Sequence, residues 1–144
     1  MKKRLFTHTS FTTTLLATAG LLVVYIGLEI LVTPIAFYAA YRIDLPENIS
    51  LVNELRANGG YLVASGIMLI SGVFVHAMRF TALVLGIALF TSFALTRIIS
   101  VIVDGMPAVE LQYALGLELI FAVLLLIALS WYLSILSSSK RKAE

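Results

Sequence analysis

The chain has 144 residues, of which 60% are apolar and 12% charged, whereas soluble domains carry roughly 45–50% apolar and about 25% charged residues. This composition excludes an ordinary soluble domain, and the net charge of +2 comes from short basic flanks, which argues against a nucleic-acid partner. The absence of cysteine excludes disulfides, thiolate catalysis and iron–sulfur clusters.

Four apolar segments are long enough to cross a hydrocarbon core about 30 Å thick, which takes roughly 20 helical residues. The predicted spans cover residues 14–41, 59–77, 80–103 and 107–136. Pro34 interrupts the first span, so we expect a tilt or kink there. The short connectors 76–79 and 104–107 make the last three spans antiparallel neighbours. We therefore predict one all-α integral membrane domain, an antiparallel four-helix transmembrane bundle.

The first connector, residues 42–56, is the only one long enough for structure of its own. Leu45, Ile49 and Val52 follow helical spacing, and Asp44 lies three residues before Glu47, as in a helix cap. We expect a short helix lying at the membrane interface.

The lysine and arginine residues predict the orientation. Seven lie on the side of the two termini and the second connector: Lys2, Lys3, Arg4, Arg79, Lys140, Arg141 and Lys142. Three lie on or towards the other side: Arg42, Arg56 and Arg97. The positive-inside rule then puts both the N- and C-termini in the cytoplasm.

Several ionisable residues lie within the spans, where a charge costs about 2.5–3.5 kcal/mol on insertion scales. Glu29 is predicted near the middle of the first span, roughly 20 Å from Arg42 by helical rise. Arg97 and Glu118 are predicted at comparable depth, roughly 10–17 Å below the outer turn. Each such residue needs a partner or a function.

The polar parts of all four spans converge in the outer leaflet, which predicts a buried polar cluster. Its candidate members are Glu29, Arg56, Asn58, Tyr61, Arg97, Ser100, Asp104 and Glu118. The charged members include three carboxylates and two arginines, so one negative charge is left over, and Glu29 is the expected holder of a proton or a cation.

Structural roles remain open for the same residues. Arg97 with Glu118 or Asp104 can act as a clamp between helices. Arg56 can reach the lipid headgroups, and Asp104 suits the turn before Gly105. Glu29 can be a protonated hydrogen-bond donor between helices.

Several motifs together resemble those of a known family. They are Arg56-Ala57-Asn58-Gly59-Gly60-Tyr61, Arg97-Ile98-Ile99-Ser100, Asp104-Gly105-Met106-Pro107 and Glu118. The chain resembles the bacterial family of small four-helix membrane proteins catalogued as domain of unknown function 4345, most closely over the last three spans. The resemblance implies a multi-pass protein of the bacterial inner membrane whose outer arginine, aspartate and glutamate belong to the family pattern. It implies no activity, substrate or cofactor.

Catalytic and cofactor chemistry finds little support. The two histidines, His8 and His76, lie on the cytoplasmic side, away from the polar cluster, which argues against a catalytic triad and a haem site. The carboxylates Glu29, Asp104 and Glu118 are a poor metal site, because the neighbouring arginines would repel a metal ion. We therefore expect no catalytic residues, no metal and no cofactor.

Three functions stay open. The first is a non-enzymatic structural or accessory protein that contacts the lipid bilayer and a membrane partner, or forms a homo-oligomer. The second is a proton- or cation-linked module that binds or transports a small molecule through the polar cluster. The third is an enzyme acting on lipid or quinone, which would use Glu118 or Asp104 for acid–base chemistry.

Overall fold

The computed structural model describes the backbone of residues 2–140 and the side chains of residues 10–137, and all its regular structure is helical. The basic clusters at the two ends, and His8, therefore have side chains outside the described range. The helices are α1 (Lys2–Val32), α2 (Pro34–Ala39), α3 (Ile49–Phe74), the short 3₁₀ helix η1 (His76–Met78), α4 (Arg79–Asp104) and α5 (Val109–Lys140).

Four segments of this structure are long and apolar enough to cross a membrane. They cover Ser10–Val32, Ile49–Phe74, His76–Asp104 and Val109–Ser137. The prediction of an all-helical chain with four such segments is confirmed, and their length and composition indicate a multi-pass membrane protein.

The first segment ends earlier than predicted. α1 stops at Val32, Thr33 has a non-helical backbone with φ −130° and ψ 57°, and Pro34 begins the separate helix α2. Proline has no backbone N–H and its ring clashes with the preceding turn, so it suits the first position of a new helix. Glu29 therefore lies in the last turn of α1, about 4.5 Å by helical rise from its end. The prediction that Glu29 lies at mid-span was wrong.

The connector also differs from the prediction. No separate interfacial helix forms within residues 42–56, because α3 begins at Ile49 and runs without interruption to Phe74. Its N-cap is Asn48, whose side-chain oxygen accepts a hydrogen bond from the N–H of Leu51 at 3.2 Å; the expected cap, Asp44, lies outside the helix. Asparagine is among the residues that best satisfy the free N–H groups of a first turn.

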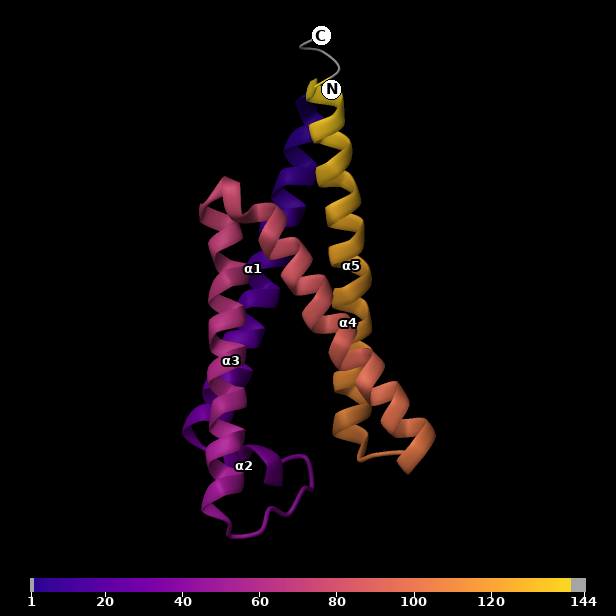
Figure 1. Ribbon diagram of the computed structural model, residues 1–144. Helices are drawn as coiled ribbons and strands as arrows, with labels where there is room; N and C mark the ends of the chain where they lie inside the picture. Colours follow the sequence, from indigo (N-terminus) through magenta and orange to yellow (C-terminus); the bar gives the residue numbers. More distant parts are fainter. Residues whose placement is uncertain (1, 141–144) are drawn as a thin grey trace.

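The two later connectors are tight, as the sequence indicates. Val75 and the three-residue η1 join α3 to α4. α4 ends at Asp104, and its C-cap Gly105 has a φ of +94°, a conformation that residues with a Cβ rarely adopt. Residues 40–48 and 105–108 lie at one end of the molecule, called here the loop end, and η1 lies towards the other end with the starts of α1 and the end of α5 (Figure 1).

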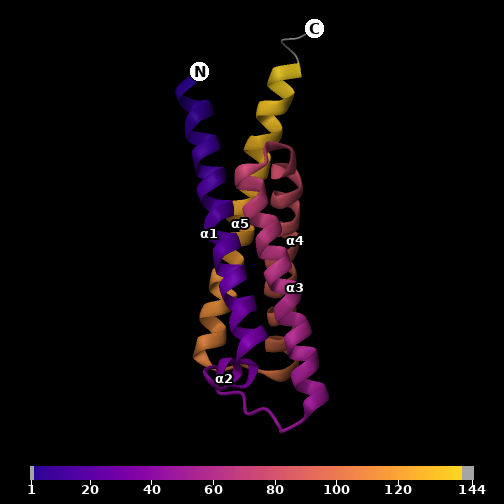
Figure 2. The same ribbon diagram turned by 90° about the vertical axis from the view of Figure 1, so that its left-hand side faces the viewer.

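α1 and α3 lie side by side along most of their length (Figures 1 and 2). Glycines facing one another allow this approach. A Cβ added to Gly27 would lie 2.8 Å from the carbonyl oxygen of Gly59, and one added to Gly66 would lie 2.7 Å from that of Gly20. Small residues that bring two backbones together are a common basis of helix association in membranes.

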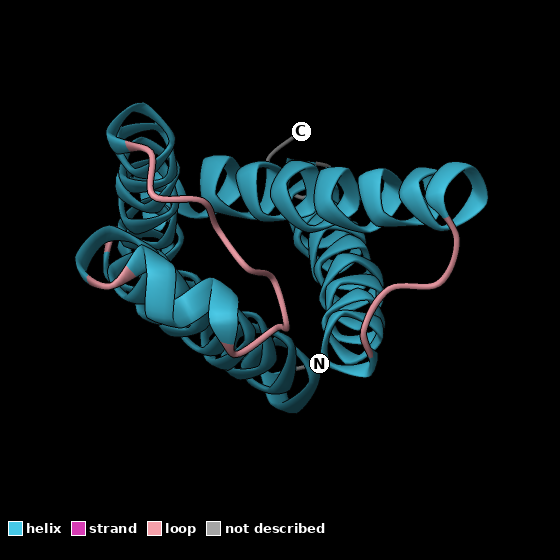
Figure 3. Cartoon of the chain, turned by 90° about the horizontal axis from the view of Figure 1, so that it is seen from below, coloured by secondary structure: helices cyan, strands magenta, loops and turns pink. Residues whose placement is uncertain are grey.

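α4 and α5 form the second pair, and the two pairs diverge towards the loop end (Figures 1 and 3). Each of the four long helices contributes one fully buried leucine to the core: Leu16, Leu69, Leu83 and Leu125. The buried residues of α4 all lie between Arg79 and Ala94, so its last ten residues contribute none. The splayed loop end is where the predicted polar residues are found.

Candidate functional site

Arg97 of α4 and Glu118 of α5 form an ion pair within the second helix pair. The Nε–H of Arg97 donates to both carboxylate oxygens of Glu118, at 2.9 and 3.0 Å. The exposed fractions of the two side chains are 32% and 12%. About two turns before Arg97 in α4, Phe90 stacks on Phe121, which lies about one turn after Glu118 in α5, with ring centroids 4.9 Å apart. Of the two partners considered for Arg97, the structure therefore selects Glu118.

Asp104 has a different partner. Its Oδ2 accepts a hydrogen bond of 2.9 Å from the hydroxyl of Ser100, one turn earlier in α4, and both residues are exposed. This local bond at the end of the helix fits the structural reading of Asp104 as a turn residue.

The α3 candidates do not join these groups. Arg56 is exposed, and its guanidinium donates to the carbonyl oxygen of Leu31 in the last turn of α1. Carbonyls in a last helical turn lack partners within their own helix, so Arg56 satisfies one of them. Asn58 and Tyr61 are exposed, and their side chains form no hydrogen bond within residues 10–137. The eight candidates thus do not form a single cluster.

Glu29 lines a cavity of about 520 Å³ at the loop end, between α1, α2 and α5. The other lining side chains that matter chemically are Tyr25, Phe37, Tyr41, Glu110 and Tyr113. Glu29 is half-buried, and its carboxylate has no hydrogen-bond or ion-pair partner among the described side chains. None of the lining residues is basic.

Glu110 was missed by the sequence analysis. It lies in the first turn of α5, where a carboxylate is favoured by the helix dipole. Its Oε1 accepts a bond of 3.2 Å from Arg42, which links the first connector to the second helix pair. Its Oε2 is buried and has no partner within the described structure. The signal was the acidic residue three positions after Pro107, but nothing in the sequence matches it to Arg42.

Arg79 was also misjudged, because it was counted only as a cytoplasmic charge. The side chain is buried, with 8% of the residue exposed. Its Nε donates to the carbonyl of Gly72 at 3.2 Å, and one Nη donates to the hydroxyl of Thr13 and the carbonyl of Val73 at 3.4 and 3.5 Å. Arg79 therefore ties the turn between α3 and α4 to α1.

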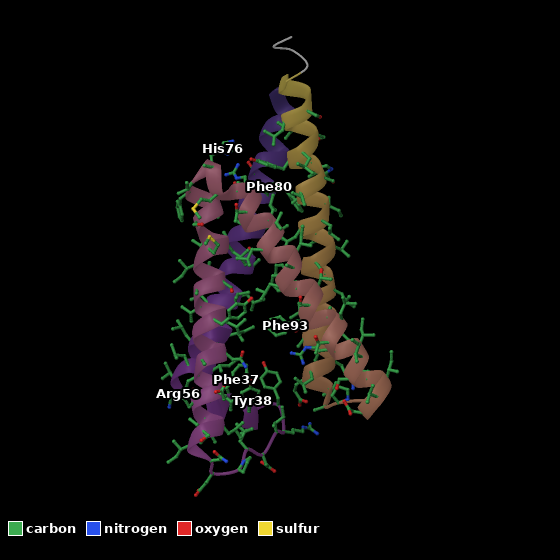
Figure 4. All side chains as sticks on the ribbon, viewed as in Figure 1. Phe37, Tyr38, Arg56, His76, Phe80 and Phe93 are labelled. Atoms are coloured by element: carbon green, nitrogen blue, oxygen red, sulfur yellow. The ribbon has the colours of Figure 1, made fainter. Side chains whose placement is uncertain are left out.

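Tyr38 occupies the space between the two helix pairs. Figure 4 shows it beside Phe37, below Phe93 of α4. Burial raises the pKa of the Tyr38 hydroxyl, and the positive charge of Arg97 partly opposes this. α2 thus places the Tyr38 hydroxyl close enough to Arg97 for the two groups to interact electrostatically.

The described side chains contain no group of three or more histidine, aspartate or glutamate residues close enough to bind a metal ion. His76 is exposed in η1, and its ring centroid lies 6.3 Å from that of Tyr132. These two residues lie towards the end of the molecule opposite the Glu29 cavity (Figure 1).

Comparison with known proteins identifies the family. The family model described as domain of unknown function (DUF4345) matches residues 11–129, which is most of the chain and includes every candidate site residue. No curated protein and no solved structure matches the chain. The resemblance seen in the motifs is therefore confirmed, and the chain belongs to the DUF4345 family.

Proposed function

We propose that the chain is an antiparallel four-helix bundle of the bacterial inner membrane with both termini in the cytoplasm. The excess of lysine and arginine at the terminal side supports this orientation. The arrangement of the helices fits it, because the start of α1 and the end of α5 lie at the same end of the molecule (Figure 1). Cysteine substitutions at Ser10 and Asn48, labelled in intact cells with a membrane-impermeant maleimide, test it. Labelling at residue 10 but not 48 would contradict the orientation.

Within that membrane, we propose a non-enzymatic accessory role. The observation that supports it is that the charged side chains of the spans hold helices together. Arg97 joins α4 to α5 through Glu118, Arg56 joins α3 to α1 through a carbonyl, and Arg79 joins the η1 turn to α1. Such contacts stabilise the arrangement of the helices. The outer surface of the bundle is then available to a membrane partner or to a second copy of the chain.

Native mass spectrometry of the protein released gently from its own membrane tests this role. A defined complex with another membrane protein or with further copies of the chain, free of any small ligand, supports it. A monomer that carries a stoichiometric small molecule contradicts it.

The Glu29 cavity favours a second candidate function, a small-molecule binding module. Its volume of about 520 Å³ lies within the usual range for ligand sites, roughly 300–1,000 Å³. The unpaired Glu29 supports the proton- or cation-linked form of this function. In the same mass spectra, this candidate requires an adduct that disappears in Glu29→Gln.

A further inference from the structure

We propose that the cavity between α1, α2 and α5 binds an amphiphilic organic cation, such as one with a substituted ammonium group. This inference rests on the second candidate function above and names its ligand class. It is an alternative to the accessory role, whose test requires a complex free of any small ligand.

The charge of the cavity comes from two carboxylates on different helices. Glu29 approaches from the last turn of α1 and Glu110 from the first turn of α5. The only cation that touches them in the described structure is Arg42, which binds Oε1 of Glu110. Glu29 and Oε2 of Glu110 are left without a partner. The cavity therefore carries an excess of negative charge, which a ligand cation can neutralise.

The rest of the lining favours an organic cation over a metal ion. Aromatic rings come from all three elements: Tyr25 from α1, Phe37 from α2 and Tyr113 from α5, with Tyr41 just after α2. The rings of Phe37 and Tyr41 lie 5.0 Å apart. Aromatic faces attract alkylated ammonium groups, whereas a small hard cation needs more oxygen ligands than two carboxylates supply.

The depth of the cavity indicates an amphiphile. Both carboxylates lie within one turn of a helix end, at the loop end of the apolar segments. A ligand bound there can place its charge near the headgroup region and its apolar part between the diverging helix pairs. Such a ligand can be a free lipophilic cation or the ammonium headgroup of a lipid.

Arg42 opposes the binding of a cation at this site. Its side chain is 73% exposed, so the ion pair with Glu110 contributes little to stability. It does compensate part of the charge of Glu110. Removing Arg42 should therefore strengthen the binding of a cation, whereas a purely structural role for the pair predicts no such gain.

Equilibrium dialysis of the full chain in nanodiscs tests the proposal. The probe is tetraphenylphosphonium, and tetraphenylborate is an anion of the same shape. With empty nanodiscs as the blank, we expect saturable binding of one phosphonium per chain and none of the borate. Glu29→Gln should weaken binding about tenfold or more, and Arg42→Gln should tighten it several-fold. Glu54→Gln, an exposed carboxylate on α3 outside the cavity, is the matched control and should change nothing.

The comparison of two lipids identifies the natural source of the cation. If a lipid ammonium group occupies the cavity, the affinity ratio of the unmodified protein to Glu29→Gln will be smaller in phosphatidylcholine than in digalactosyldiacylglycerol, which has no ammonium group. Equal ratios indicate a free cation.

Saturable binding of the borate in place of the phosphonium would overturn the assignment of a cation and leave the binding module standing. Absence of saturable binding for both probes, or phosphonium binding that Glu29→Gln does not change, would overturn the site itself. Melting temperatures of the variants, measured in parallel, separate lost binding from lost folding.

Discussion

The contact between α1 and α3 gives a sharp test of the fold at Gly27. A Cβ at this position would lie 2.7 Å from the backbone nitrogen of Val63, 2.8 Å from the carbonyl oxygen of Gly59 and 2.9 Å from the Cβ of Leu62. Two of these atoms belong to the backbone, so no side-chain rotation can make room. Reaching ordinary contact at 3.4 Å requires the helices to separate there by about 0.7 Å, the difference between 3.4 and 2.7 Å.

Two opposing effects set the magnitude for Gly27→Ala. Overpacking of a tight interface costs about 1–3 kcal/mol. Replacing a glycine inside a helix by alanine returns about 0.5–1 kcal/mol through helix propensity. We therefore expect a net loss of about 1–2 kcal/mol in the free energy of unfolding.

Matched controls isolate the packing contribution. Gly60 of α3 and Gly116 of α5 are also helical, but a Cβ at either position meets no atom within 4 Å. Gly60→Ala and Gly116→Ala should be neutral or slightly stabilising. The free energy of unfolding can be measured in mixed micelles by far-ultraviolet circular dichroism. If Gly27→Ala were as stable as Gly60→Ala, α1 and α3 could not be in contact at Gly27, and the assigned pairing would be refuted.

The remaining predictions concern the charged and phenolic side chains. Arg97→Gln should lower the free energy of unfolding by about 2–3 kcal/mol, because the carboxylate of Glu118, whose side chain is only 12% exposed, loses its partner. Adding Glu118→Gln should recover part of this loss in the same unfolding assay, whereas adding Asp104→Asn should not. Arg79→Met should cost about 2 kcal/mol, since three hydrogen bonds are lost at a buried site, and a melting temperature equal to that of the parent would contradict this. Burial raises the pKa of the Tyr38 hydroxyl above its usual value of 10.0. The contribution of the protonated hydroxyl to the free energy of unfolding is therefore complete below pH 10 and is lost as the pH rises through the pKa of the folded state. A Tyr38→Phe variant should therefore lose less stability above pH 10 than the parent, and parallel pH profiles would refute the assignment.

Features that depend on local sequence were predictable. The four apolar segments follow from length and composition, because the thickness of the bilayer alone fixes how many helical residues are needed. The break near Pro34 and the reversal at Gly105 follow from the backbone chemistry of single residues. The family could also be identified this way, since its motifs are short and contiguous.

The position of the polar residues relative to one another was less predictable. Placing Arg97 and Glu118 at similar depth needed only a count of residues from the connecting turn, but choosing Glu118 over Asp104 required the rotation of α4 against α5. Glu29 was misplaced because the predicted first span ran through a kink at Pro34 to residue 41, whereas α1 ends at Val32, so the span was counted from the wrong end point.

What the sequence determined by itself is therefore the number of spans, their approximate limits and the family. Only the tertiary structure decided that the eight polar candidates do not form a single cluster, that Arg79 is buried, and that Arg42 and Glu110 meet across the loop end. The reason is that hydropathy indicates which residues lie within the membrane but not how each helix is rotated about its own axis. That rotation is set by close contacts between particular residues, such as the facing glycines of α1 and α3.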